Sequence, residues 1–108
     1  MPKYLLEVNY TLDGVKGVGA EGGTTRVAAA TALVESLGGK VDSFYFALGD
    51  TDAYVVVDLP DNSSAAAGAL AVNMGGGATI RTVALLTAAE VDQAVSAVKK
   101  ATYRPPGG

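Results

Sequence analysis

The first segment of the chain alternates between its two faces with the period of a β-strand. Over Tyr4 to Thr11, successive side chains point to opposite sides, and this predicts a half-buried strand. One side would meet the core and the other would carry more polar residues. The expected core side holds Tyr4, Leu6, Val8 and Tyr10, and the other side holds Leu5, Glu7, Asn9 and Thr11.

The next periodic segment has the spacing of a helix. Thr24 or Thr25 can cap its start, and Gly38-Gly39 stands where a helix commonly ends. Its expected inner face holds Val27, Ala30, Leu33, Val34 and Leu37.

Two apolar runs then lie close together, from Val41 to Leu48 and from Tyr54 to Leu59. The short segment Gly49-Asp50-Thr51-Asp52 separates them, and such a short gap predicts an antiparallel hairpin. Pro60-Asp61-Asn62-Ser63-Ser64 stops the second strand and offers caps for another helix.

The pattern of that second helix predicts an inner face made of Ala67, Leu70, Ala71 and Met74. Gly75-Gly76-Gly77 ends it, and a fourth strand is expected from Thr79 to Leu86. Thr87-Ala88-Ala89-Glu90 is typical of a capping box and predicts a last helix. That helix would bury Val91, Ala94, Val95 and Val98, and residues 103–108 would form a flexible tail.

The order of these elements, β-α-β-β-α-β, is that of a ferredoxin-like α+β fold. The length of 108 residues fits one domain over residues 1–108. We expect an antiparallel sheet with the first and third strands central and parallel to each other, helices on one face, and one extra C-terminal helix. The other face is a candidate subunit interface, with Glu7, Asn9, Tyr54, Asp58 and Arg81 as its predicted residues.

Composition narrows the class of protein. Hydrophobic residues make up 49% of the chain and the mean hydropathy is +0.28, which is high for so small a monomer. We therefore expect a homo-oligomer. A net charge of −3, with no basic cluster larger than Lys99-Lys100, argues against nucleic acid as a partner. No run is long and apolar enough for a membrane span and no signal peptide precedes the first strand, so a cytoplasmic location without membrane partners is expected.

The chain has neither histidine nor cysteine. This excludes disulfides, thiol nucleophiles, histidine-based catalysis and the usual zinc sites. Acid and base chemistry would fall to Asp, Glu, Lys or Tyr, and a cation could bind only through oxygen ligands. We expect no cofactor and no metal.

Two glycine-containing motifs have a functional and a structural interpretation. Residues 17–22 match G-x-G-x-x-G with Asp42 downstream, but they do not directly follow the first strand. We interpret them as a flexible segment before the first helix. Asp50 and Asp52 could bind a cation or act as a base, or they could simply favour the turn.

The tyrosines are the best candidates for a ligand site. Tyr4 and Tyr10 lie on the core side of the first strand, where a buried phenol needs a hydrogen-bond partner or a cavity. Core packing is the alternative. The predicted ligand-binding residues are Tyr4, Tyr10, Tyr45, Asp50 and Asp52.

Eight short segments in order carry a family resemblance. They are Pro2-Lys3-Tyr4-Leu5, Tyr10-Thr11, Glu21-Gly22-Gly23, Glu35-Ser36-Leu37-Gly38-Gly39, Phe44-Tyr45-Phe46-Ala47, Val57-Asp58-Leu59-Pro60-Asp61, Leu85-Leu86-Thr87 and Tyr103-Arg104-Pro105-Pro106-Gly107. In this order the chain resembles the GYD-domain family of small bacterial proteins. The resemblance implies a ferredoxin-like fold of the dimeric α/β-barrel type and no particular mechanism. One departure is that Thr51 occupies the tyrosine position of the naming motif.

Three functions are compatible with these observations. The leading hypothesis is a homo-oligomeric module that binds a small apolar or phenolic ligand between sheet and helices. The second is a cofactor-independent enzyme of the monooxygenase or isomerase kind, with Tyr10 or an aspartate as the acid or base. The third is a purely structural self-assembly unit. A ligand-sized cavity beside Tyr4 and Tyr10 would favour the first two over the third.

Overall fold

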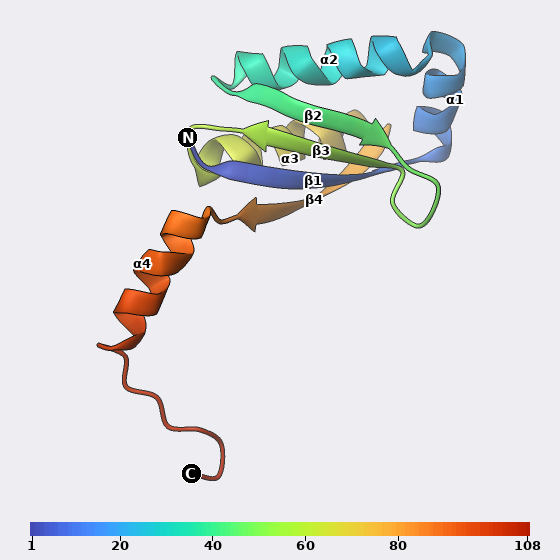
Figure 1. Cartoon of the computed structure of the whole chain (residues 1–108). Helices are drawn as coiled ribbons and strands as arrows, with labels where there is room; N and C mark the ends of the chain where they lie inside the picture. Colours follow the sequence, from blue (N-terminus) through green and yellow to red (C-terminus); the bar gives the residue numbers. More distant parts are fainter.

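The computed structural model describes all 108 residues as a four-stranded sheet with four helices (Figure 1). None of the helices has the length and apolar content needed to cross a membrane. In chain order the elements are β1 (Lys3–Tyr10), α1 (Leu12–Glu21), α2 (Gly23–Ser36), β2 (Lys40–Phe46), β3 (Ala53–Asp58), α3 (Asn62–Gly75), β4 (Ala78–Leu85) and α4 (Ala88–Val98).

The strands lie in the order β2-β3-β1-β4, and every neighbouring pair is antiparallel. The ferredoxin-like α+β arrangement and the β2–β3 hairpin are confirmed. The expectation that β1 and β3 run parallel is wrong. A helical crossover makes β2 parallel to β1, and the tight hairpin then reverses the chain, so β3 must run against β1.

The register of the sheet confirms the alternation read from β1. Tyr4 pairs with Val57 and Val8 pairs with Ala53 on the face that the helices cover, and all four are buried. On the opposite face Glu7 pairs with both Tyr54 and Arg81. This second face has no helix over it, and we call it the open face (Figure 1).

The buried core runs along the covered face from Tyr4 to Val8 of β1 and along β3. Leu59, Val34 of α2 and Ala65 of α3 close over Tyr4 and the central strand residues. The inner face predicted for α2 is confirmed, since Val34 is buried and Leu37 packs against the same cluster. The buried hydrophobic residues are Tyr4, Val8, Val34, Ala53, Val55, Val57, Leu59 and Ala65.

The glycine-rich segment before α2 is a helix rather than a flexible linker. The Thr11 side chain caps α1 by accepting a hydrogen bond from the Gly14 amide at 3.2 Å. Gly22, with φ of 85°, then turns the chain directly into α2, which has no side-chain cap. The expected capping role of Thr24 or Thr25 is therefore wrong, because the helix already starts at Gly23.

Helix α3 meets the sheet with a different face from the predicted one. Leu70 is 61% exposed and Met74 is 83% exposed, so the larger apolar residues point away from the core. The side that faces inward consists mostly of small residues, because β4 packs against it and Leu37, at the end of α2, lies close to Gly68. The least exposed positions are Ser64, Ala65, Gly68, Ala69 and Val72.

Helix α4 leaves the body of the molecule after β4 (Figure 1). Its capping box is confirmed, with Thr87 and Glu90 each bonding the other's backbone amide. The expectation that its valines lie inside is wrong, since no other element of the chain covers this helix. Val91, Val95 and Val98 are all exposed.

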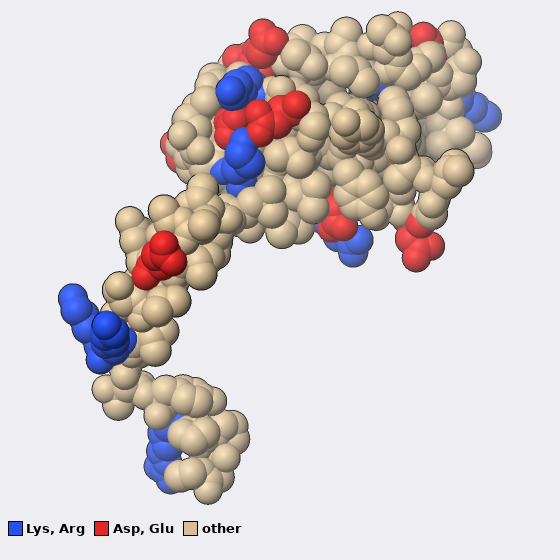
Figure 2. Space-filling model, viewed as in Figure 1, with Lys and Arg blue, Asp and Glu red and all other residues tan.

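The edge strand β2 carries an irregularity and a group of charges. Its register with β3 shifts between Val41 and Ser43, which is a β-bulge at Asp42. Lys3 forms ion pairs with Asp42 and with Asp58, the latter at 3.0 Å. The Lys3 ammonium lowers the pKa of Asp42. Figure 2 shows charged side chains gathered at this end of the sheet and few over its centre.

Gly39 provides a test of how tightly α2 is joined to the sheet. A Cβ at this position would lie 2.1 Å from the Asp58 carbonyl oxygen, so the backbone would have to move. We expect Gly39→Ala to lower the free energy of unfolding by about 1–3 kcal/mol. The control is Gly19→Ala, where a Cβ meets no atom within 4 Å and should raise stability by about 0.5–1 kcal/mol. Denaturant titration measures both, and equal effects at the two positions would contradict the close packing.

Candidate functional site

A two-part cleft opens between the sheet and the helices at the Tyr10 end of β1. One part has a volume of about 330 Å³ and lies among α1, the start of α2 and the end of α3. The other has a volume of about 110 Å³ and reaches inward between α2 and the sheet. The two parts adjoin, because both are lined by Tyr10, Arg26, Val72 and Ala78.

The inner part of the cleft is apolar. Every residue that lines it is hydrophobic except Arg26. Helix α2 contributes Ala29, Ala30, Leu33 and Val34, and the sheet contributes the covered-face residues Leu6, Val8, Tyr10, Phe44, Val55, Ala78 and Ile80. An apolar wall of this kind favours a ligand that has little to hydrogen-bond.

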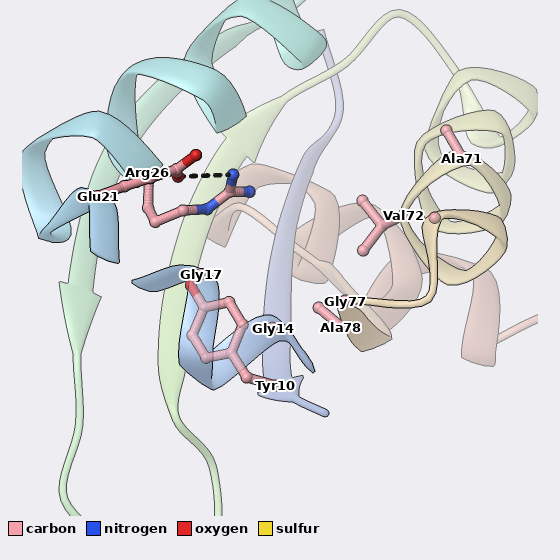
Figure 3. A pocket seen from close by; sticks show the side chains of 10 residues that line it. Tyr10, Gly14, Gly17, Glu21, Arg26, Ala71, Val72, Gly77 and Ala78 are labelled. Carbon is pink, nitrogen blue, oxygen red and sulfur yellow. Dashed lines mark ion pairs between the residues drawn. The ribbon is translucent and has the colours of Figure 1, made fainter. Parts of the chain in front are cut away.

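The outer part of the cleft holds the polar groups. In Figure 3 the Tyr10 ring rises beside α1, and the Arg26 side chain reaches over the same space from α2. Glu21 lies next to Arg26, with its Oε2 atom 3.7 Å from the guanidinium Nη1 atom. That distance exceeds the usual range of an N–H···O hydrogen bond, so the ion pair is loose.

Two glycines of α1 explain why space remains here. Gly14 lies directly against the Gly77 backbone, where a Cβ would come within 1.7 Å of the Gly77 carbonyl oxygen. Gly17, one turn later, lines the cleft, and a Cβ there would meet nothing within 4 Å. The first glycine fixes α1 against the sheet, and the second leaves the cleft open.

Tyr10 is held at the mouth by its backbone while its phenol faces the cleft. The Tyr10 amide donates a hydrogen bond to Asp52 Oδ2 at 2.8 Å. Partial burial raises the pKa of the Tyr10 hydroxyl, the Arg26 guanidinium opposes this rise, and the Asp52 carboxylate adds to it. The phenol is therefore protonated near neutral pH and can donate a hydrogen bond.

Tyr4, the other tyrosine on this strand face, lies outside the cleft. Its ring is 2% exposed and its hydroxyl donates to Asn62 Oδ1 at 2.6 Å. Tyr4 also lines a separate hollow of about 270 Å³ together with Ala66 and Ala84. The hydrogen-bond partner that a buried phenol needs is thus supplied by α3.

The other three predicted ligand residues are dispersed. Tyr45 lies on the open face and is 72% exposed, opposite Tyr54 on β3. Asp50 lies in the hairpin loop, where its carbonyl oxygen accepts from Asn9 Nδ2 at 2.5 Å. Only Asp52 lies close to Tyr10, through the bond to its amide, and the five residues do not form one site.

The five predicted interface residues share the open face but differ in their surroundings. Glu7, Tyr54 and Arg81 are cross-strand neighbours, with Arg81 Nε 3.7 Å from Glu7 Oε2. Asn9 bonds to the hairpin loop. Asp58 is buried and already paired with Lys3. Exposed apolar groups that the sequence did not single out, such as Val83 at 40% exposed, lie among them.

Arg26, Glu21 and Gly17 were not predicted as site residues. Arg26 has one signal in the sequence: it is the only charged residue in a helix of small and apolar residues until Glu35. Gly17 and Glu21 lie in the G-x-G-x-x-G match at residues 17–22, which was interpreted as a flexible segment, and their place at the cleft depends on α1 being a helix. No group of three or more Asp or Glu side chains is arranged to hold a metal ion.

Comparison with known proteins bears on the family and not on the ligand. No curated protein matches the chain in sequence. The sequence model of the GYD domain matches residues 4–95, which span every strand, α1 to α3 and most of α4. The protein therefore belongs to the GYD-domain family.

Proposed function

We propose that the protein binds a small, largely apolar ligand in the cleft between its sheet and helices, and that it does so as a homo-oligomer. The observation that carries the ligand proposal is the inner part of the cleft, where only Arg26 interrupts a hydrophobic wall. An empty apolar cavity costs packing energy, and a ligand of matching shape restores the missing contacts.

The polar groups at the mouth of the cleft are better suited to orienting a ligand than to catalysing a reaction. The raised pKa of Tyr10 keeps its hydroxyl protonated, so it serves as a hydrogen-bond donor and is a poor general base near neutral pH. Asp52, the nearest carboxylate to Tyr10, is already engaged by the Tyr10 amide. These features support the binding module over the enzyme of the monooxygenase or isomerase kind.

Two uncovered apolar surfaces support self-association. The open face exposes Tyr45, Tyr54 and Val83, and the detached α4 exposes a row of valines. Both belong to the same chain, so a second copy would supply a matching pair of surfaces through one twofold axis. We propose that the open faces of two copies pack together, with α4 of each copy reaching across to the other, as the dimeric barrel type implies.

Filling the apolar part of the cleft tests the ligand site. Ala30 lines this part and Ala32, on the same helix, does not. With 2-naphthol as the probe, we expect Ala30→Leu to weaken binding at least about tenfold, or about 1.4 kcal/mol, because the new side chain occupies the ligand's volume. Ala32→Leu is the matched control and should bind like the unchanged protein. Isothermal titration calorimetry measures this, and equal affinities in both variants would contradict the location.

The Tyr10 phenol gives a testable dependence of stability on pH. Because the pKa of Tyr10 is raised in the folded protein, the unfolded chain loses this proton first as the pH rises. The free energy of unfolding should therefore fall from about pH 10, the ordinary phenol value, up to the folded pKa. We expect Tyr10→Phe to lack this part of the fall, and Tyr103→Phe, in the exposed tail, to keep it. Denaturant titrations at about pH 9 and about pH 11 compare the three proteins.

Self-association is tested by measuring the molecular mass of the unchanged protein and of a variant with a new charge on the open face. We expect light scattering to give a multiple of 10.8 kDa at micromolar concentration. Val83→Glu places a carboxylate on the open face, on the edge strand β4, and should shift the mass toward the monomer. Leu48→Glu, in the fully exposed hairpin loop, is the control and should leave the mass unchanged. A monomer mass for the unchanged protein would refute the oligomer proposal.

A further inference from the structure

The two parts of the cleft differ in chemistry, and Arg26 stands at their junction. Arg26 and Tyr10 line both the outer and the inner part. A ligand that fills the apolar part therefore ends within reach of the guanidinium and the phenol. A ligand that fits this placement would have a polar group at one end and an apolar body at the other.

The charge of Arg26 is poorly compensated in the protein. Glu21 is its only ionic partner, and at 3.7 Å from Nη1 the contact is loose. Arg26 also lies in the first turn of α2, which has no acidic residue and no side-chain cap at its start. The first turn is the positive end of the helix dipole, so a cation there is locally unfavourable. An anion at the mouth of the cleft would relieve both effects.

The Arg26 side chain is placed and shaped to bind such an anion. The Arg26 side chain is 37% exposed, so some of its N–H groups can reach a ligand without any rearrangement of the core. A guanidinium presents a planar fork that matches a carboxylate with two parallel hydrogen bonds. The protonated Tyr10 hydroxyl faces the same space and can add a third donor.

We propose that the cleft takes a small carboxylic acid with an apolar body, the carboxylate binding to Arg26 and the body lying in the apolar inner part. This inference rests on the ligand-binding function proposed above and names the ligand's chemical class. Glu21 pairs loosely with the guanidinium in the free protein, and the ligand's carboxylate replaces it as the closer partner.

The charged side chains that line the outer part of the cleft favour a ligand with a single negative charge. Arg26 and Glu21 are the only charged side chains around the outer part, so the site offers one positive and one negative group. A phosphate dianion would face repulsion from Glu21 with a single cation to balance it. A carboxylate needs one cationic partner and fits a site with one guanidinium.

A pair of probes with the same naphthalene ring and different charge tests this class. At neutral pH 2-naphthoate carries a carboxylate, whereas 2-naphthol is neutral. In the full-length protein we expect 2-naphthoate to bind about tenfold or more tightly than 2-naphthol, since a hydrogen bond to a charged group contributes more than one between neutral groups. Raising the salt concentration should reduce this preference.

Substitutions at the two charged residues should act in opposite directions. We expect Arg26→Gln to abolish the preference for 2-naphthoate and to leave 2-naphthol binding nearly unchanged. Glu21→Gln removes the competing carboxylate and should increase the affinity for 2-naphthoate. A protein that is merely destabilised at this site would lose affinity for both probes in both variants.

Two glycines of α1 give a matched control for the location. Gly17→Leu projects into the cleft and should block both probes, whereas Gly19→Leu lies outside it and should block neither. A Cβ added at either position would meet no atom within 4 Å, and neither glycine has a positive φ, so both variants should fold.

The outcomes separate the inference from the function on which it rests. Equal affinity for the two probes, or a preference for 2-naphthoate that survives Arg26→Gln, would overturn the carboxylate inference and leave the apolar ligand site standing. Failure of both probes to bind would overturn both. Binding of both probes that persists in Gly17→Leu would place them elsewhere and overturn the site.

Discussion

The size of the side chains between helices and sheet governs the rest of this structure. At the Tyr4 end of β1, Leu37 and Leu59 pack with the buried core, and a Cβ on Gly68 would already approach Leu37 to 3.3 Å. At the Tyr10 end the facing positions carry Gly17, Ala71 and Ala78, which are too small to close it. One strand face thus ends in a packed core on one side and in a cleft on the other.

Arg26, at the edge of this cleft, occupies an electrostatically unfavourable position in its helix. A cation in the first turn of a helix, with no side-chain cap before it, opposes the helix dipole. Conflicts between local preference and the overall fold concentrate at functional positions, because function can preserve what stability alone would not. The conflict at Arg26 and the unfilled volume beside it coincide in space, and each strengthens the interpretation of the other.

The sequence predicted those parts of the fold whose signal is periodic and strong. The alternation in β1, the inner face of α2 and the capping box at Thr87 are all found, because each depends on local chemistry. Helix α3 is so rich in alanine that its two sides look alike, and its packing against β4 determines which side faces inward. Helix α1 was not predicted because glycine has a low helix propensity. One of its glycines, Gly14, is nevertheless needed, because the helix packs there directly against the Gly77 backbone.

Sequence periodicity also could not distinguish the two tyrosines of β1. Tyr4 and Tyr10 share a face by alternation, but their functions depend on what lies across from each. Tyr4 meets the Asn62 amide group and closes the core, whereas Tyr10 meets a gap with Arg26 above it. The distant residues that decide this, Gly17 and Arg26, come from separate helices whose arrangement no local pattern encodes.

The bulge at Asp42 bears on whether the edge strand β2 can pair with the strand of another molecule. A regular outer strand offers its free backbone groups as a template on which further chains can add without limit. In β2 the extra residue interrupts this row of backbone groups. The ion pair between Asp42 and Lys3 places two charged groups at the same point. Edge-to-edge pairing of copies along β2 is thereby disfavoured.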